Sequence, residues 1–364
     1  MVLASGGTSH AEARGPFARH PRDRRGWDRA QNHRALAFLF VSTVSYRPAA
    51  LDDAELATNL MNAAYAGMEH DPVMTRLRWK WGRTGFSIGR FIVEQDRKPI
   101  AFVAWMHGPW EMLPERHCEV EVWLDRGSMD RRLLSDLWKW IGARGIAEEA
   151  GLLLAYAAED EPEMLDVLAE LGYERARLEK VWELDLRAHG ARLVADAVEA
   201  RRRMDAEGIR LASLASWDDP DKGRKLHELN KITVQDVPHS VPIIPEPYPD
   251  FENRLNAPDR PHDRFWIALD GNDVVGMSYL RFPPVHGTVW TGYTSTHPDF
   301  RGRGVARAVK LQTLAQAAQL GVPVVRTDND AENAPMLHIN ERLGYVRRPG
   351  FVEHHKRVKE TRNA

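Results

Sequence analysis

The chain repeats its own pattern at a spacing of 172 to 174 residues, and this duplication restricts the fold more than any other feature. Each copy has two runs rich in β-branched and aromatic residues on either side of a polar turn. In the first copy the two runs are residues 90–94 and 99–105, and the turn is 96–98. In the second copy the runs are 264–269 and 274–279, and the turn is 270–273. This arrangement predicts an antiparallel hairpin in each copy.

A Leu-Gly-Tyr sequence repeats at the same spacing, at residues 171–173 and 343–345. Each follows a stretch with the apolar period of a helix, where Gly172 and Gly344 suit the left-handed conformation just past a helix end. Two such pairs at one spacing favour duplication over coincidence. We therefore predict an α+β fold made of two tandem domains, each a mixed, mostly antiparallel β-sheet flanked by helices.

The 364 residues are enough for two domains of about 150 residues each. We expect an N-terminal domain at residues 44–190 and a C-terminal domain at 208–358, joined by a charged helix at 191–207 whose arginines are solvated. Residues 1–43 contain seven arginines and three acidic residues with no sustained apolar period, which predicts a flexible tail. Residues 359–364 are expected to form a second, short tail.

Charge and cysteine content exclude several classes of protein. The 50 Lys and Arg residues nearly balance the 52 Asp and Glu residues, so no global attraction to nucleic acid or anionic membranes is expected. The single cysteine, Cys118, cannot form an intramolecular disulfide, and a thiolate-rich metal site is excluded. The apolar run at residues 35–41 is far shorter than the ~20 residues of a membrane span. We expect a metal-free cytoplasmic protein, monomeric or homodimeric, that binds neither nucleic acid nor membrane.

The segment from 288 to 320 is the most informative about chemistry. A Thr-rich strand ends before Pro298, and Arg301-Gly302-Arg303-Gly304 then leads into a helix with apolar residues at three- and four-residue steps. The first N–H groups of a helix lack internal partners and favour anions. Two glycines would let a phosphate approach the backbone, and two arginines would add cationic donors.

This turn has four possible interpretations: a solvated loop, a dinucleotide fingerprint, a P-loop and a coenzyme A diphosphate site. The dinucleotide fingerprint needs a small residue where Arg307 stands, and the Gly-Lys-Ser/Thr of a P-loop is absent. The coenzyme A site is favoured over the solvated loop.

The pattern Arg301-x-x-Gly304-x-Ala306 after a strand resembles the acetyl-CoA signature of the GCN5-related N-acetyltransferases, the GNAT superfamily. A second strand, Asn333, and Gly344-Tyr345 eleven residues after it keep the order and spacing of that family. The tandem arrangement, with one degenerate half, resembles bacterial two-domain members of the mycothiol synthase type. The resemblance implies acetyl-CoA as acyl donor, bound by Ser295, Thr296, Arg301, Gly302, Arg303, Gly304, Val305, Ala306, Asn333 and Asn340.

Asn340 departs from the family pattern, because many members have a tyrosine there that protonates the departing thiolate. An amide is a far poorer acid, so Asn340 could only hydrogen-bond the thiolate or the pantetheine. Alternatively, it is a helix residue whose amide is satisfied locally.

The first copy lacks the anion-binding turn. Its segment at 120–133 has one glycine where two are needed, and Asp125 and Asp130 stand where an anion would bind. The first half is therefore expected to keep the fold without the cofactor site. It also holds seven of the twelve tryptophans, which are either core residues or an aromatic wall of a shared substrate cleft. The loop at 237–261, with seven prolines, is either a substrate-binding lid or an insertion.

The resemblance implies transfer of an acetyl group to a primary amine of a small molecule, such as an antibiotic, its precursor or another amine metabolite. The candidate catalytic residues are Tyr293, Asn340 and Asp236, with His297 and His239 as further candidates for the base. Two alternatives remain: a CoA-binding regulatory protein with weak catalysis, and an acyl or aminoacyl transferase that uses a longer donor.

Overall fold

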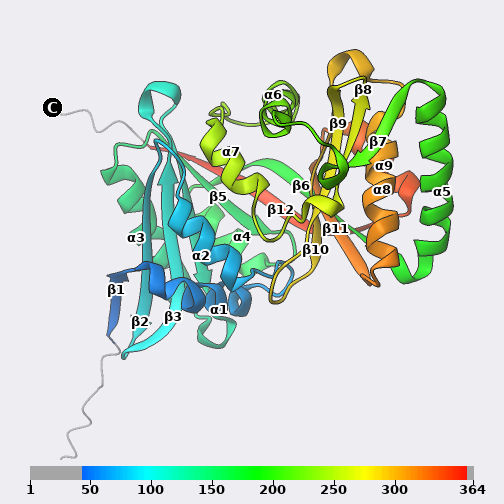
Figure 1. Ribbon diagram of the computed structural model, residues 1–364. Helices are drawn as coiled ribbons and strands as arrows, with labels where there is room; N and C mark the ends of the chain where they lie inside the picture. The colour runs from blue at the N-terminus through cyan, green and yellow to red at the C-terminus, as the bar shows by residue number, and fades with distance from the viewer. Residues whose placement is uncertain (1–42, 359–364) are drawn as a thin grey trace, which may run out of the picture. The chain divides into compact units, whose positions relative to one another are not determined.

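The computed structural model describes residues 43–358 (Figure 1). The predicted tails lie outside this range, apart from Thr43 at its first position. The same order of ten elements, β-α-α-β-β-β-α-β-α-β, occurs twice within the described residues. The first series is β1 (Val44–Pro48), α1 (Ala54–Ala64), α2 (Pro72–Trp81), β2 (Ser87–Gln95), β3 (Lys98–His107), β4 (His117–Leu124), α3 (Arg131–Ala147), β5 (Leu152–Ala158), α4 (Pro162–Glu170) and β6 (Glu174–Asp185).

The second series follows helix α5 (Leu186–Ala206). It consists of β7 (Ile209–Ser213), α6 (Lys222–Val234), α7 (Tyr248–Leu255), β8 (Phe265–Asp270), β9 (Asp273–Arg281), β10 (Val289–Thr296), α8 (Val305–Gln319), β11 (Val324–Asp330), α9 (Ala334–Leu343) and β12 (Val346–Arg357). The boundaries 44–190 and 208–358 that we assign to the two halves stay a prediction.

Both hairpins and both helix ends agree with the sequence. Strand β2 pairs antiparallel with β3, and β8 with β9. Gly172 and Gly344 have φ angles of 81° and 94°, in the left-handed region. Helix α5 begins five residues before the predicted linker helix, because the Asp185 carboxylate accepts hydrogen bonds from the N–H groups of Arg187 and Ala188.

The strands form one mixed sheet in the order β1-β2-β3-β4-β5-β12-β6-β11-β10-β9-β8-β7. Neighbours are antiparallel except for β4 with β5 and β10 with β11. The prediction of a mixed, mostly antiparallel sheet flanked by helices is confirmed.

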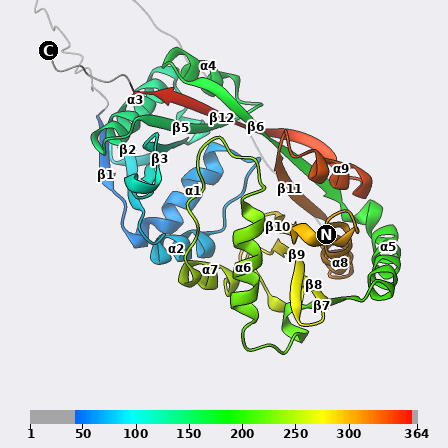
Figure 2. The same ribbon diagram turned by 90° about the horizontal axis from the view of Figure 1, so that it is seen from above.

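The two halves exchange their last strands. Strand β6 of the first series pairs with β11 and β12, whereas β12 of the second series pairs with β5 and β6 (Figures 1 and 2). Trp182 and Leu184 of β6 consequently belong to the core around α8 in the second half. The hydrophobic pattern of a strand does not say which neighbour it will have, so the sequence did not predict this exchange.

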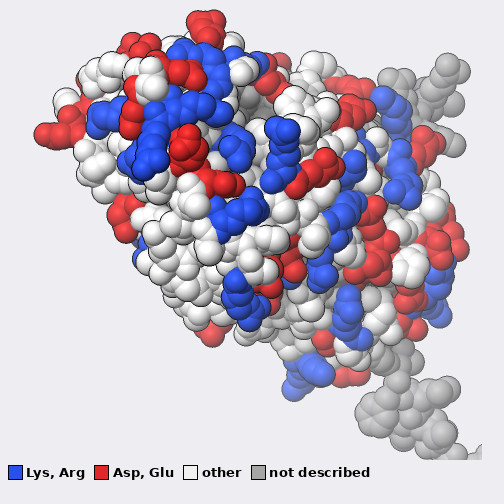
Figure 3. All heavy atoms as spheres, turned by 90° about the vertical axis from the view of Figure 1, so that its right-hand side faces the viewer, with Lys and Arg blue, Asp and Glu red and all other residues white. Residues whose placement is uncertain are grey.

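Helices cover both faces of the sheet. In the second half, α5 and α8 pack on one face, and the apolar side chains of α6 and α7 form a separate core on strands β8 and β9. In the first half, α3 and α4 pack in one core and α1 in another. On the side of the molecule that carries α5, basic and acidic side chains are interspersed (Figure 3).

Candidate active site

Strands β10 and β11 separate soon after they meet. They pair only through Val289 with Val325 and Trp290 with Arg326. Beyond these pairs, β10 continues beside β9, and β11 continues beside β6. Gly292 interrupts the register between β10 and β9, and a Cβ atom there would lie 1.9 Å from the Tyr279 ring. The backbone of β10 is therefore free on its β11 side from Thr291 onward.

Two hydroxyl groups on this part of β10 are buried without partners among the described residues. They belong to Ser295 and Thr296, each 8% exposed, whereas the Thr291 hydroxyl faces the hydroxyl of Tyr345. A buried hydroxyl with no hydrogen bond is costly, so this strand is suited to a polar ligand beside it.

The turn after β10 leaves the start of α8 uncapped. Gly302 and Gly304 have φ angles of 76° and 84°. Gly304 is the N-cap residue, and no side chain caps the helix. Within residues 43–358, the N–H groups of Gly302, Arg303 and Gly304 form no hydrogen bond. These amides, with the first N–H groups of α8, can bind an anion.

The equivalent turn in the first half is closed by its own carboxylates. Asp130 accepts a hydrogen bond from the N–H of Leu133 at 2.8 Å, and Asp125 accepts one from Gly127 at 3.3 Å. Asp130 is the N-cap residue of α3 and thus occupies an amide of its first turn, whereas the first turn of α8 has no side-chain cap among the described residues. This contrast supports the prediction that only the second half binds the cofactor.

Arginines surround the open turn, two of them held by acidic residues. Arg301 lies 2.5 Å from Asp236, and Arg303 lies 3.2 Å from Glu207. Asp236 is paired with Arg301 and is not among the residues that line the large cavity described below, so its catalytic role stays a prediction. Arg203, which the sequence predicts to be a solvated residue of the linker helix, also lies beside the turn. Its guanidinium nitrogen lies 2.3 Å from the position of a Cβ atom on Gly304.

The two asparagines of the motif have local partners. Asn333 caps α9 by accepting a hydrogen bond from the Met336 N–H at 3.4 Å. Asn340 is fully buried; its amide donates to Asn329 at 2.6 Å and accepts from Lys310 at 2.7 Å. The structure therefore agrees with the alternative in which Asn340 is satisfied locally, and its contact with a thiolate or pantetheine stays a prediction. Val305 is likewise buried in the core, which leaves only its backbone for a ligand.

Burial lowers the pKa of Lys310 to about 7, against 10.5 for an ordinary lysine. Between these pH values the unfolded chain binds a proton that the folded chain does not, so the free energy of unfolding should rise with pH. We expect a slope of up to about 1.4 kcal/mol per pH unit between pH 7 and 9. Urea unfolding should show this slope in the wild type and in Lys98→Met, at an exposed position, but not in Lys310→Met. Equal slopes in all three would contradict the assignment.

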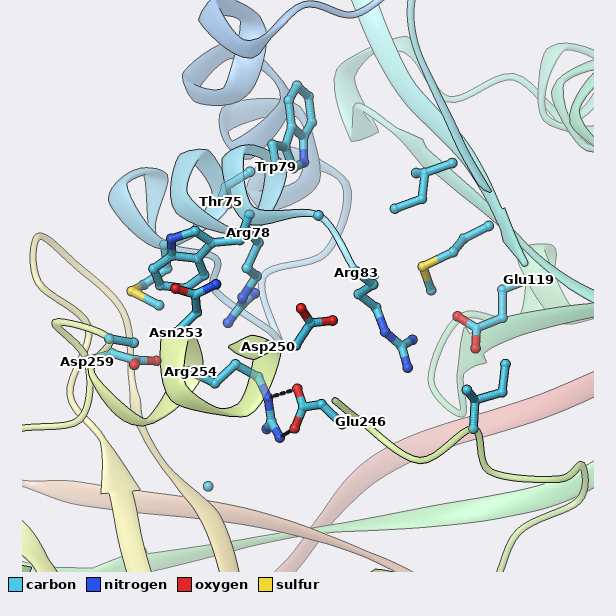
Figure 4. A pocket seen from close by; sticks show the side chains of 18 of the residues that line it. Thr75, Arg78, Trp79, Arg83, Glu119, Glu246, Asp250, Asn253, Arg254 and Asp259 are labelled. Atoms are coloured by element: carbon cyan, nitrogen blue, oxygen red, sulfur yellow. Dashed lines mark hydrogen bonds and ion pairs between the residues drawn. The ribbon is translucent and has the colours of Figure 1, made fainter. Parts of the chain in front are cut away.

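A cavity of about 820 Å³ lies between the two halves. The first half contributes residues of α1, α2 and strands β2 to β4; the second contributes residues of α6, α7, β9 and β10 and the proline-rich loop (Figure 4). Ile243, Ile244, Pro245 and Glu246 of that loop line the cavity, which favours the substrate-binding interpretation of the loop. A cavity of this size suits a small molecule.

Tyr293 is the predicted catalytic residue that the structure brings to the cavity, together with Gly292. Its hydroxyl donates a hydrogen bond to Thr233 at 3.2 Å. Burial raises the pKa of Tyr293 above its ordinary value of 10. The phenol is then a weaker acid than a thiol of pKa ~8.5, so it is suited to hydrogen bonding rather than to complete proton transfer.

The tryptophans of the first half divide between the two interpretations. Trp79, Trp81, Trp105 and Trp123 line the cavity, whereas Trp138 is buried in the core. Of the candidate bases, His239 lines a smaller cavity of about 280 Å³, and the His297 ring accepts from the Asp299 N–H.

Among the described residues, no group of three or more His, Cys, Asp and Glu side chains is arranged to hold a metal ion. In the same range, no helix is both long and apolar enough to cross a bilayer.

Comparison with known proteins gives the same fold. Residues 226–345 match the model of the acetyltransferase (GNAT) family. A tandem GNAT protein from the clavulanic acid biosynthesis pathway, solved without AcCoA, is 15% identical, with a TM-score of 0.67 over 88% of this chain and 100% of that one. A GCN5-related N-acetyltransferase from Sphaerobacter thermophilus is 17% identical, with a TM-score of 0.61 over 86% and 95% of the two chains. At these identities the structural likenesses show the fold.

Proposed function

Residues 226–345 are a GNAT-family domain within a tandem GNAT fold, and on this basis we propose that the protein transfers an acetyl group from acetyl-CoA to a primary amine of a small molecule. The open start of α8 carries this proposal, because the matching turn of the first half is capped by carboxylates. The backbone amides of residues 302–306 would hold the diphosphate, with Arg301, Arg303 and Arg203 beside it. We also propose a cytoplasmic location.

The free edge of β10 and its unpaired hydroxyls suit the rest of the donor. In the reaction, the amine nitrogen forms a bond to the acetyl carbon, the C–S bond breaks to release CoA as its thiolate, and the proton lost by the nitrogen passes through water to that thiolate or to solvent. Backbone N–H groups of β10 beyond Trp290 would stabilise the negative charge on the carbonyl oxygen, and one such donor can contribute about 3 kcal/mol. Tyr293 would hydrogen-bond the reacting groups where the cavity meets this strand.

The proposal is tested by incubating the protein with acetyl-CoA and a panel of primary amines, with detection of free thiol and of the acetylated product by mass spectrometry. We expect thiol release that depends on the amine. Binding of acetyl-CoA in calorimetry without amine-dependent release would favour the regulatory alternative. Faster release from longer acyl donors would favour the third candidate.

A further inference from the structure

The first half contributes two carboxylates to the cavity. Glu119 and Glu121 lie two residues apart on β4 and both line it, as does Trp123. Alternate residues of a strand share one face, so these side chains point to the same side at intervals of roughly 7 Å. The residues between them, Val120 and Val122, belong to the core on the other face.

Glu121 corresponds to Tyr293 in the duplication. The two positions are 172 residues apart, the same spacing as Tyr173 and Tyr345. Both line the cavity, one from each half. The half without a cofactor turn therefore presents an acid at the position where the other half presents a phenol beside the proposed acyl site.

Neither Glu119 nor Glu121 forms an ion pair with a described residue, and Glu121 accepts one hydrogen bond, from Trp123 at 3.1 Å. Arg83 and Arg90 face them but stack on aromatic rings, Arg83 over Phe86 and Arg90 over Trp79.

The electrostatics agree with this geometry. Burial, Glu121 and Glu353 raise the pKa of Glu119 to about 7, although Arg83 acts in the opposite direction. Burial also raises the pKa of Glu121, despite Arg90 and the Trp123 hydrogen bond. A cation placed between two such carboxylates would favour their ionised forms.

Other acidic groups on the wall lie beside donors or cations. Glu246 is paired with Arg254 (Figure 4), and Asp250 accepts hydrogen bonds from the backbone and hydroxyl of Thr84 at 2.8 and 2.7 Å. Asp259 lies 3.7 Å from Arg260, and its Oδ1 forms no hydrogen bond with any described residue. Figure 4 shows Glu119 on the opposite side of the cavity from Asp259. Arg78 also lines the cavity and forms no ion pair with any described residue, so an anionic acceptor is the competing possibility.

We propose that Glu119 and Glu121 bind a cationic group of the acceptor, so that the acceptor is an elongated molecule with a second cationic group, an ammonium or guanidinium, distant from the reacting amine. Apolar side chains also line the cavity, among them Ile88, Met106 and Ile244, and they suit the aliphatic part of such a molecule. This inference rests on the proposed function for the acceptor amine that reacts. The binding of the second cationic group rests on residues of the first half alone.

The test compares acceptors of one length that differ at the far end: 1,5-diaminopentane, pentylamine and 5-aminopentanoate, with homologues of four to eight carbons. We expect the diamine to have a kcat/KM at least about tenfold above that of pentylamine, because hydrogen bonds to charged groups are stronger than those between neutral groups. The aminoalkanoate should be the poorest acceptor. Equal kcat/KM for diamine and monoamine, or preference for the aminoalkanoate, would overturn the proposal.

The double variant Glu119→Gln/Glu121→Gln should raise KM for the diamine about tenfold and shrink its advantage over pentylamine, whereas exposed Glu163→Gln should behave like the wild type. Circular dichroism checks that each variant folds, and the comparison of acceptors with the wild type needs no variant.

Quenching of tryptophan fluorescence by 1,5-diaminopentane, without acetyl-CoA, gives an independent readout. If the diamine quenches the wild type but not the double variant, and no acetyl transfer is found, the proposed function is refuted and this inference stands. If acetyl transfer occurs without any preference for the diamine, this inference is refuted and the proposed function stands.

Discussion

Replacing Gly304 with valine is expected to weaken acetyl-CoA binding by at least roughly 100-fold. The φ angle of 84° is one that a β-branched residue rarely adopts. In addition, a Cβ atom there would enter the space in front of the open amides, 2.3 Å from the Arg203 guanidinium. Calorimetric titration with acetyl-CoA measures the loss.

Gly321→Val is the matched control for backbone strain. Gly321 follows the other end of the same helix with a φ angle of 78°, and a Cβ atom there meets no other atom within 4 Å. We expect the free energy of unfolding of this variant to fall by about 1–2 kcal/mol, because one residue is strained. It should bind acetyl-CoA as the wild type does. Met129→Ala in the closed turn of the first half should also bind normally. Similar affinity losses in all three variants would show that the turn of residues 301–304 is not the binding site.

A polypeptide of residues 208–358 alone is expected not to fold. Without β6, strand β11 loses its partner over seven residue positions, and the core around α8 loses Trp182 and Leu184. Strand β12 would lose both of its neighbours, β5 and β6. Unpaired strand edges favour aggregation. Circular dichroism and gel filtration of the fragment should show unfolded or aggregated protein.

Co-expression with residues 43–207 should restore a soluble complex, because each fragment carries the strand that the other lacks. In the full chain, Leu184→Ala is expected to cost about 2–5 kcal/mol and to leave one unfolding transition for both halves. A fragment 208–358 that folds alone with a native spectrum would contradict the strand exchange.

Local features of the fold could be predicted because neighbouring residues determine them. The hairpins follow from alternating runs around a turn, and Gly172 and Gly344 from the stereochemistry of helix ends. The anion-binding turn was recognisable for the same reason, since glycines, arginines and the helix that follows are contiguous. Asp125 and Asp130 likewise marked the first half as closed.

Features that depend on distant segments could not be predicted. Arg203 belongs to a charged helix and reaches Gly304 only because α5 packs along α8. The burial of Asn340 depends on Lys310 and Asn329, which come from other elements. Glu119 and Glu121 stand in an ordinary alternating strand, and only the apposition of the halves turns them toward a cavity. The sequence did contain a signal for these two residues: two acids that alternate with valines on a strand and share its face with Trp123.

The exchange of β6 and β12 also constrains how such a protein can change over evolutionary time. Deleting the copy without the open turn would remove a strand that its sister requires, so the gene cannot shorten to one copy without losing the fold. The residues of that copy that face the cavity, by contrast, are not needed to bind the acyl donor. Substitutions at these positions can therefore change which acceptor binds without changing the residues proposed to bind the donor and stabilise the reaction.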